Sequence, residues 1–428
     1  MKILFTPYSG GSIAHIVRSL AVADCLLKRG HEILFTSTTS KREFVRKAGY
    51  EVYGDGHPDV NLNDENDQTI SYFKNNRHLF IAWMRDEIRA ADDFRPDILV
   101  NSPNFMGTPA GSLFNIPYIS IINAQWLMEY RGLLGIGKSK NHIGHQLFRK
   151  VAKPIFSYKF EKFYMKEVIS FYNELKIPRV PRRRIHIHNS NPAIIPGIPE
   201  FEPLERTKRT NLHYVGPLFW QGFEQAAFEP SYAFSDISPG RPFIYISLGG
   251  SIFRKQSYEE LIGAFAKKTE WNILLSLGPN FSREDFKRDM PHFAIRTYVA
   301  GLKTCQYADV IVNTGSHGTV MQALWNGKPV IAIPHNIDQG SIAARLVELK
   351  IGANLNPINL KDFSNRGVYF EKATQISWAV IMKEIEKVLH DPQMKRNAEC
   401  FGSILRSYSS RDEKAADLIE KYASKNHR

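Results

Sequence analysis

The residues best suited to chemistry lie between Asp309 and Gln339. A turn of small residues, Thr314–Thr319, separates an apolar, β-branched run from a short helix and a second apolar run. Backbone N–H groups and the positive end of the helix dipole would point at a ligand in this turn, which favours an anionic group. Asp338 and Gln339 follow the second run, at the carboxyl edge where open α/β sheets bind ligands. An ordinary turn without a ligand would have the same spacing.

Two series of alternating strands and helices would position these groups. Apolar runs predict strands near residues 2–7, 31–37, 50–53, 97–101, 117–122, 185–188 and 212–215, and then near 243–248, 271–277, 295–299, 309–313 and 330–333. Stretches such as 73–91, 106–115, 145–152, 155–175 and 320–326 predict helices, and three more follow at 375–389, 392–405 and 412–423. The alternation predicts an α/β fold with two doubly wound, parallel sheets.

Composition suggests where the domains divide. The stretch 216–241 is rich in Pro, Gly and Ser and has little periodicity, so we expect a linker there. It would separate a first Rossmann-like domain, residues 1–215, from a second one, residues 242–405. The final segment, 406–428, is expected to be a helix that could pack back on the first domain.

The overall composition limits the class of protein. Of 428 residues, 43% are hydrophobic and 23% are charged, which is ordinary for a globular chain that divides into domains. No apolar run is long enough for a membrane span, and the N-terminus lacks a secretory pattern. The three cysteines, Cys25, Cys305 and Cys400, form neither a disulfide framework nor a metal site. We therefore expect a cytoplasmic protein, as a monomer or homodimer.

The net charge of +13 comes largely from basic clusters at 138–140, 149–153, 182–184 and 206–209. Three interpretations stay open: a solvated face, an attraction for anionic substrates or a membrane surface, and nucleic-acid binding. No nucleic-acid-binding motif accompanies the charge, so nucleic acid is the least favoured partner. The HIGH sequence at 142–145 follows a loop and not a Rossmann strand, and His186 and His188 lack further ligands for zinc.

Several blocks of the sequence resemble one family. GGSIAH before an amphipathic helix, KRGHEILF, YVGPLFW, IYISLGGS and TGSHGTVMQALWNGKPVIAIPHNIDQ are similar to the inverting, nucleotide-sugar-dependent glycosyltransferases of family 1, in particular the bacterial macrolide-type branch. The resemblance implies the GT-B fold, in which two Rossmann-like domains face a central cleft. Turns at 8–15, 249–251 and 314–319 would line that cleft.

The resemblance also implies that His15 is the catalytic base. The family places a histidine in the turn that enters the first helix, where it deprotonates the acceptor hydroxyl, a role suited to imidazole because it titrates near working pH. An aspartate usually orients this histidine, but Ser102 occupies its position here and Asn104 follows. Either Ser102 or Asn104 fixes the ring by a neutral hydrogen bond, or another acid serves, or activity is lost. A neutral partner would leave a weaker base.

The donor-binding residues that the resemblance implies all lie in the second domain. They are Gly249, Gly250, Ser251, Val299, Thr314, Gly315, Ser316, His317, Gly318, Thr319, Gln322, Asp338 and Gln339. Thr314 stands where many relatives have a histidine against the donor pyrophosphate, so backbone N–H groups would carry more of the binding. Gln322 would contact the ribose, and Asp338 with Gln339 the sugar hydroxyls, although Asp338 could instead be a helix N-cap.

No metal or other cofactor is expected. Helix-terminus amides can stabilise a leaving nucleoside diphosphate, and no DxD-like pair is placed for Mg²⁺. Candidate walls of an acceptor pocket are Gly11, Trp83, Phe105, Asn123 and Trp126, with Met106 and Gln125 beside them. A place in the structural core is an equal alternative for these side chains.

The sequence thus predicts an enzyme that transfers a sugar from a UDP- or dTDP-type donor to a hydroxyl of a small, largely apolar acceptor such as a natural product, with inversion. Two alternatives stay open. One is another reaction on the same fold, such as epimerisation of a sugar nucleotide or transfer to a lipid acceptor at a membrane. The other is a catalytically impaired accessory protein, which the missing aspartate and Thr314 would support.

Overall fold

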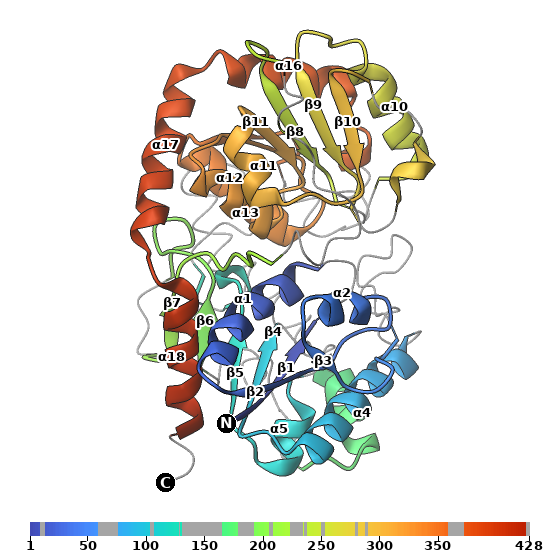
Figure 1. Ribbon diagram of the computed structural model, residues 1–428, viewed down its shortest axis with the longest axis vertical. Helices are drawn as coiled ribbons and strands as arrows, with labels where there is room; N and C mark the ends of the chain where they lie inside the picture. The colour runs from blue at the N-terminus through green and yellow to red at the C-terminus, as the bar shows by residue number, and fades with distance from the viewer. Residues whose placement is uncertain are drawn as a thin grey trace. The chain divides into compact units, whose positions relative to one another are not determined.

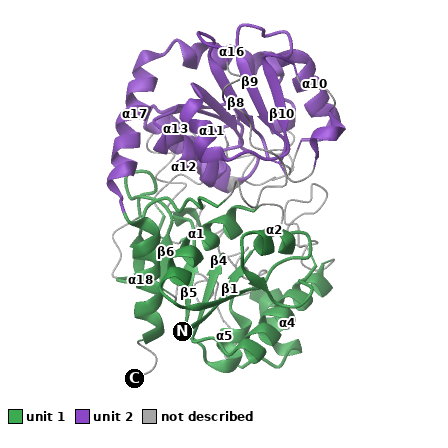
Figure 2. Cartoon of the chain, viewed as in Figure 1, with its two compact units in different colours: residues 1–131, 138–222, 410–428 green, residues 132–137, 223–409 purple. Residues whose placement is uncertain are grey.

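The chain forms two compact units, which Figure 2 colours separately. Unit 1 comprises residues 1–131, 138–222 and 410–428, and unit 2 comprises 132–137 and 223–409. The computed structural model describes residues 1–8, 13–58, 76–102, 107–127, 129–130, 165–178, 192–204, 209–222, 234, 238–249, 253–278, 281–286, 290–357 and 372–424. The segment 216–222, at the start of the expected linker, belongs to unit 1: Trp220 is buried and donates to Asp24 over 3.0 Å.

Unit 1 is built on one parallel sheet of seven strands in the order β3-β2-β1-β4-β5-β6-β7. The strands are β1 (Lys2–Pro7), β2 (Glu32–Phe35), β3 (Glu51–Val52), β4 (Ile98–Ser102), β5 (Tyr118–Ile121), β6 (Ala193–Ile195) and β7 (Leu212–Tyr214). The chain order reverses between β1 and β4, and ligands bind at such a switch point in doubly wound sheets. The register places Pro7, the last residue of β1, opposite Ser102.

Helices cover both faces of this sheet (Figure 1). They are α1 (Ala14–Lys28), α2 (Arg42–Lys47), α4 (Arg77–Phe94), α5 (Pro109–Phe114) and α18 (Arg411–Ser424), with a 3-10 turn at Ala124–Trp126. Leu4, Leu34 and Leu99, from three neighbouring strands, share a buried cluster with alanines of α4 and α5. The C-terminal helix α18, red in Figure 1, packs against α1, β4 and β5.

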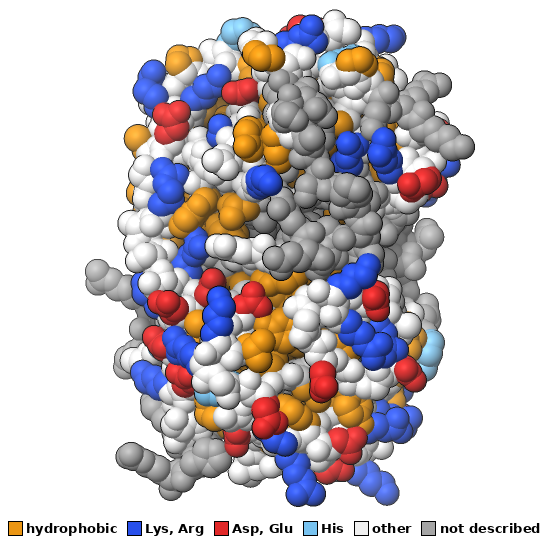
Figure 3. All heavy atoms as spheres, in the orientation of Figure 1, with side chains coloured by type: hydrophobic (Ala, Val, Ile, Leu, Met, Phe, Trp, Pro, Cys, Tyr) orange, Lys and Arg blue, Asp and Glu red, His pale blue; other side chains and the backbone are white. Residues whose placement is uncertain are grey.

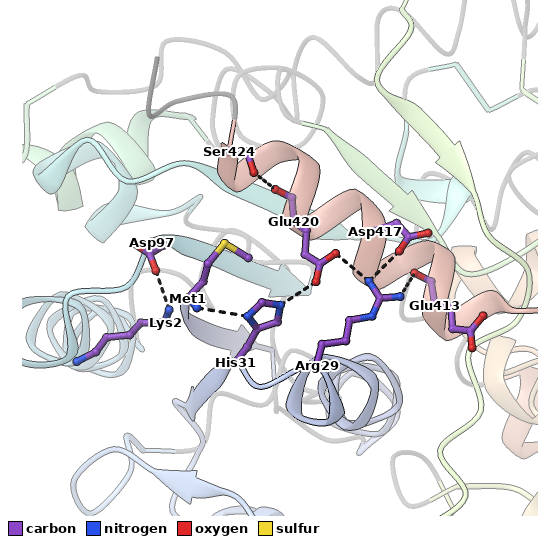
Figure 4. Close-up of polar contacts among 9 residues, drawn as sticks. All are labelled: Met1, Lys2, Arg29, His31, Asp97, Glu413, Asp417, Glu420 and Ser424. Atoms are coloured by element: carbon purple, nitrogen blue, oxygen red, sulfur yellow. Dashed lines mark hydrogen bonds and ion pairs between the residues drawn. The ribbon is translucent and has the colours of Figure 1, made fainter.

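Charged contacts join α18 to the start of the chain, as Figure 4 shows. Arg29 donates to Asp417 at 2.7 Å and to Glu420 at 2.8 Å. Nε2 of His31 lies 2.8 Å from the other Glu420 oxygen, and its Nδ1 lies 3.3 Å from the Met1 amino group. These partly exposed contacts fix the position of α18, while the apolar face beneath supplies more of the stability.

Unit 2 contains a second parallel sheet, in the order β10-β9-β8-β11-β12-β13. Its strands are β8 (Phe243–Ser247), β9 (Asn272–Ser276), β10 (Phe293–Arg296), β11 (Val310–Asn313), β12 (Val330–Ala332) and β13 (Gly352–Asn354). Its helices are α10 (Lys255–Phe265), α11 (Gly301–Tyr307), α12 (His317–Trp325), α13 (Ile337–Glu348), α16 (Trp378–Leu389) and α17 (Pro392–Ser407), with a 3-10 turn at Arg283–Asp285. The buried strand residues pack against α10 and α16 in one core.

The predicted α/β class with two parallel sheets is confirmed, and several element boundaries differ. β6 and β13 were not predicted, because three residues are too few to show a period. Helix α12 begins at His317 and not at Val320, and β10 lies at 293–296 instead of 295–299. The predicted strand at 185–188 and helix at 145–152 lie outside the described residues.

The described surface carries charges of both signs. On the face shown in Figure 3, Lys and Arg side chains are interspersed with Asp and Glu, which is typical of a solvated face. Apart from Arg209, which pairs with Glu129 at 3.0 Å, the basic clusters named above lie outside the described residues. None of the helices within the described ranges has the length and apolar character that a membrane crossing requires.

Candidate acceptor and donor sites

In unit 1, His15 and Ser102 form the contact with the clearest chemical meaning. His15 lies in the first turn of α1, and Ser102 ends β4, the strand that pairs with β1. Nδ1 of His15 is 3.1 Å from Oγ of Ser102, whose side chain is fully buried. When Nδ1 carries the proton and donates it to Ser102, Nε2 keeps its lone pair and can accept a proton. Ser102 thus occupies the orienting position, with a neutral oxygen.

Three aromatic rings extend from His15 towards α4. The Tyr8 ring lies 5.8 Å from His15 and 5.6 Å from Trp83. The ring of His57 stacks on that of Trp83. The two ring centroids are 5.5 Å apart and the ring planes are inclined by 21°. Trp83 was predicted as an acceptor wall, and it is almost fully buried in a core cluster of α4. Tyr8 begins the turn 8–15 that was expected to line the cleft but was not named as a site residue, and His57 lies in none of the motifs named from the sequence.

Asn123, the second described candidate for an acceptor wall, has a structural partner. Nη1 of the buried Arg18 donates to its Oδ1 over 2.6 Å. Burial lowers the pKa of Arg18 to about 10, and the negative charge of Glu202 opposes that shift. The guanidinium therefore stays charged and fixes the start of the loop after β5. An arginine in a helix is usually exposed, so the sequence did not predict the contact between Arg18 and Asn123.

The remaining acceptor candidates are only partly covered by the structure. Trp126 is half-buried at the end of the 3-10 turn after β5. Gln125 beside it is buried, and neither its Oε1 nor its Nε2 has a hydrogen-bond partner among the described residues. Gly11, Asn104, Phe105 and Met106 lie outside the described residues.

In unit 2, the turn between β11 and α12 is shaped by side-chain-to-backbone contacts. Oδ1 of Asn313 accepts from the N–H of Gly315 at 2.7 Å, which closes a tight turn after the strand. Gly315 adopts φ +81°, and a Cβ there would lie 2.8 Å from the carbonyl oxygen of Gln339. Glycine is therefore required, and the turn packs closely on α13.

Helix α12 starts directly from this turn with an open N-terminus. Ser316 is the N-cap residue in extended conformation, and its side chain makes no capping hydrogen bond. The first turn of α12 thus has no capping hydrogen bond from its N-cap side chain. Space is open beside Gly318, where an added Cβ would meet nothing within 4 Å. Thr314 and His317 are both buried. This geometry suits a phosphate held by backbone amides.

Asp338 and Gln339 lie in the first turn of α13, and neither of them is the N-cap residue of that helix. The N-cap is Asn336, whose Oδ1 accepts from the N–H of Gln339 at 3.0 Å, so the interpretation of Asp338 as the cap is wrong. The backbone N–H of His335 donates to Oε1 of Gln339 at 3.1 Å. Gln339 is left with its amide N–H groups to offer a ligand.

Three further residues complete the described donor candidates. The Gln322 side chain lies over the start of α11, where a Cβ on Gly301 would be 2.3 Å from Oε1. Val299 is half-buried just before that helix. Gly249 adopts φ +67° and its carbonyl accepts from the buried Tyr258 hydroxyl at 2.8 Å. Gly250 and Ser251 lie outside the described residues.

His335 is a buried group that the sequence did not reveal. It precedes the cap of α13, and burial lowers its pKa to about 3, so the ring is neutral at physiological pH. A neutral imidazole adds no positive charge at this edge of the sheet. Within the described ranges, no three His, Cys, Asp or Glu side chains are grouped to hold a metal ion.

Comparisons with known proteins agree with this arrangement. The chain is 26% identical over 341 residues to an uncharacterised glycosyltransferase of Methanosarcina mazei, with 78% of the chain and 79% of that protein covered. It is 23% identical over 358 residues to the NDP-glycosyltransferase YjiC of Bacillus subtilis, with 80% and 81% covered. A 147-residue segment is 30% identical to the demethyllactenocin mycarosyltransferase of Streptomyces fradiae, covering 34% of the chain and 30% of that protein. No protein-family profile matches the chain.

Solved structures show the same fold. The calicheamicin glycosyltransferase CalG4 superimposes with a TM-score of 0.68 at 18% identity, covering 100% of the chain and 99% of CalG4. The glycosyltransferase VinC, solved in complex with dTDP, gives a TM-score of 0.65 at 14% identity, with 99% and 100% covered. The chain is thus similar in sequence to glycosyltransferases and shares the fold of these structures, which identifies it as a glycosyltransferase with the GT-B fold.

Proposed function

We propose that this glycosyltransferase moves a sugar from a nucleoside-diphosphate sugar, of the UDP or dTDP type, to a hydroxyl of a small, largely apolar acceptor, with inversion at the anomeric carbon. The observation that carries the proposal is the 3.1 Å contact between His15 and Ser102 at the end of β4. This contact supports a base role for His15, because a ring held at Nδ1 would direct Nε2, and activation of a weakly acidic hydroxyl needs an oriented base.

Unit 2 would hold the donor. The uncapped start of α12 and the glycine turn before it offer backbone N–H groups to the diphosphate. Asp338 can accept and Gln339 can donate hydrogen bonds to sugar hydroxyls. VinC, which shares the fold, binds dTDP. The expectation that neither a metal nor another cofactor is needed stays a prediction.

The reaction would be a single displacement. As the acceptor oxygen forms its bond to the anomeric carbon, Nε2 of His15 takes the hydroxyl proton. The bond between the anomeric carbon and the phosphate oxygen breaks, and the electron pair leaves with the nucleoside diphosphate. The helix dipole and N–H groups of α12 would stabilise that departing charge. One displacement inverts the configuration.

Replacement of His15 by alanine tests the proposal. His15→Ala should lower kcat/KM for transfer by about 10²–10⁴-fold, the usual contribution of general-base catalysis, while the affinity for UDP or dTDP stays unchanged. The matched control is His390→Ala, which removes an exposed histidine at the end of α16. Full turnover by His15→Ala would remove His15 from the mechanism.

A catalytically impaired accessory protein is the second candidate. The observation in its favour is that Ser102 supplies no negative charge to His15. The same assays decide between the two, because nucleotide binding without hydrolysis or transfer, across a panel of hydroxylated acceptors including lipid-linked ones, would support the accessory role.

A further inference from the structure

A row of polar side chains continues the apolar face of the unit 1 sheet beneath α4. Leu4, Leu34 and Leu99 of β1, β2 and β4 share the cluster with α4 and α5. Side chains alternate along a strand, so the residue two positions further on points to the same face. That residue is polar in β1 and β4, and directly after the end of β2: Thr6, Asn101 and Thr36. We call these three residues the polar row.

The members of the polar row are neighbours at the carboxyl edge. Thr6 lies opposite Asn101 in the parallel register of β1 and β4. The N–H of Thr36 donates to the carbonyl of Phe5 at 2.9 Å, which places Thr36 beside Thr6 on the other side. The two threonines are fully buried and Asn101 is 2% exposed.

The polar row has hydrogen-bonding capacity that the described protein does not use. Oγ1 of Thr6, Oγ1 of Thr36 and Oδ1 of Asn101 have no hydrogen-bond partner among the described residues. Nε1 of Trp83, on α4 and in ring contact with Tyr8, is likewise without one. Each buried polar atom without a partner costs stability, so such a concentration indicates a bound group or water that satisfies them.

The aromatic side chains beside the polar row indicate which kind of ligand could bind there. Tyr8, Trp83 and His57 present a continuous set of rings, and Tyr8 also touches His15. A saturated ring with hydroxyls matches both features, because its C–H bonds can pack on aromatic rings while its hydroxyls bond to threonine, asparagine and indole N–H groups. A purely apolar ligand would leave the polar atoms unsatisfied.

We infer that the acceptor carries a hydroxyl-rich ring, a glycosyl or polyol portion, which binds the polar row beside Trp83 and presents a hydroxyl to His15. This inference rests on the proposed function, since it concerns the acceptor of that reaction. The acceptor hydroxyls would then satisfy the polar atoms of the row. The acceptor is then amphiphilic: an apolar portion bears the hydroxylated ring.

Binding by matched ligand pairs tests the inference on the full chain. A panel of aromatic alcohols and the O-glucoside of each is titrated by calorimetry in the presence of UDP or dTDP. Each glucoside should bind at least about tenfold more tightly than its aglycone, because sites built to hydrogen-bond a hydroxyl discriminate strongly against its absence. Thr36→Val and Asn101→Leu should abolish this preference while aglycone affinity stays constant.

The stability of each variant is measured separately, as a control for correct folding. Thr6→Val and Thr36→Val replace unpartnered buried hydroxyls with isosteric methyl groups, so the urea midpoint should stay constant or rise. Thr108→Val is the matched control, since this threonine is also buried with an unpartnered hydroxyl but precedes α5, outside the polar row. It should keep the full preference for glucosides.

Three results would overturn the inference: equal affinity within the pairs, no glucoside that binds, or the same loss in Thr108→Val as in the polar row. Transfer assays with the same compounds separate it from the proposed function. Tight glucoside binding without any transfer refutes the function alone, while transfer that prefers aglycones refutes the inference alone.

Discussion

At the scale of residues, the proposed role of His15 as a base depends on a partner that is a hydroxyl and not a carboxylate. A carboxylate at Ser102 would fix the ring and also stabilise the imidazolium that forms when the base takes a proton. The Ser102 hydroxyl fixes the ring through its 3.1 Å contact but brings no charge. Less stabilisation of the imidazolium would make His15 a weaker base than it would be beside a carboxylate.

Substitution at Ser102 separates orientation from charge. Ser102→Ala removes the contact that fixes the ring, and we expect kcat to fall about tenfold, the equivalent of roughly 1.4 kcal/mol. Ser102→Asp adds a negative charge beside the imidazole, which favours its protonated form. The acidic limb of the kcat/KM profile should therefore move to higher pH, because the base must be neutral to act.

A pH–rate series on the wild type and both variants provides the measurement. Ser120→Ala, on the neighbouring strand β5 with a buried side chain, is the control for loss of a serine hydroxyl. If the acidic limb of Ser102→Asp stays in place, Ser102 does not act through His15.

Some site contacts could be anticipated from the sequence and others could not. The pairing of β1 with β4 brings the ends of both strands together, so a contact between residues after them was predictable. The partnership of Arg18 with Asn123 joins residues far apart in the chain, and nothing in their local patterns marks it. The polar row is equally hidden, since two threonines and an asparagine at strand ends look like ordinary turn residues.

At the scale of elements, the turn between β11 and α12 lies against α13, and both belong to the proposed donor site. Gly315 adopts φ +81° and leaves no room for a side chain beside Gln339. Gly315→Ala would strain the backbone by about 1–3 kcal/mol and push the turn away from α13. Donor affinity should fall by about tenfold or more, measured as the Kd of UDP or dTDP.

Gly263→Ala is the matched control for this substitution. Gly263 lies in α10 of the same unit, and a Cβ there meets nothing within 4 Å. Alanine should stabilise that helix by about 0.5–1 kcal/mol without a change in nucleotide affinity. Unaltered affinity in Gly315→Ala would show that the donor does not use this turn.

Which elements were predictable follows from their length and burial. β1, β4, β8 and β11 are buried runs of four to six residues, long enough for an apolar pattern to appear. β6 and β13 have three residues each and are defined by their pairing with neighbours in the sheet. The start of α12 was placed three residues late, because a turn of small residues gives no signal for the first helical turn.

At the scale of the whole molecule, the chain returns to its first unit after completing the second. Residues 410–428 belong to unit 1, although α17 just before them belongs to unit 2. α18 buries Ala415, Ala416 and Ile419, and its Glu420 holds Arg29 and His31. The fold of unit 1 therefore depends on the last part of the chain.

Truncation at Ser409 should consequently destabilise unit 1 and spare unit 2. Loss of α18 exposes the apolar surface of α1, β4 and β5 that it covers, which should cost on the order of 3–5 kcal/mol. Unfolding in urea is followed by hydrogen exchange, at β1 and β4 for unit 1 and at β8 and β11 for unit 2. The urea midpoint of unit 1 should fall, while the midpoint of unit 2 stays constant. A chain ending at Ser424 keeps the described helix and should match the full length. Equal losses in both units would mean that they unfold as one cooperative body. A loss confined to unit 1 would show that α18 stabilises unit 1 alone, and under the proposed function the chain should then keep its affinity for UDP or dTDP without this helix.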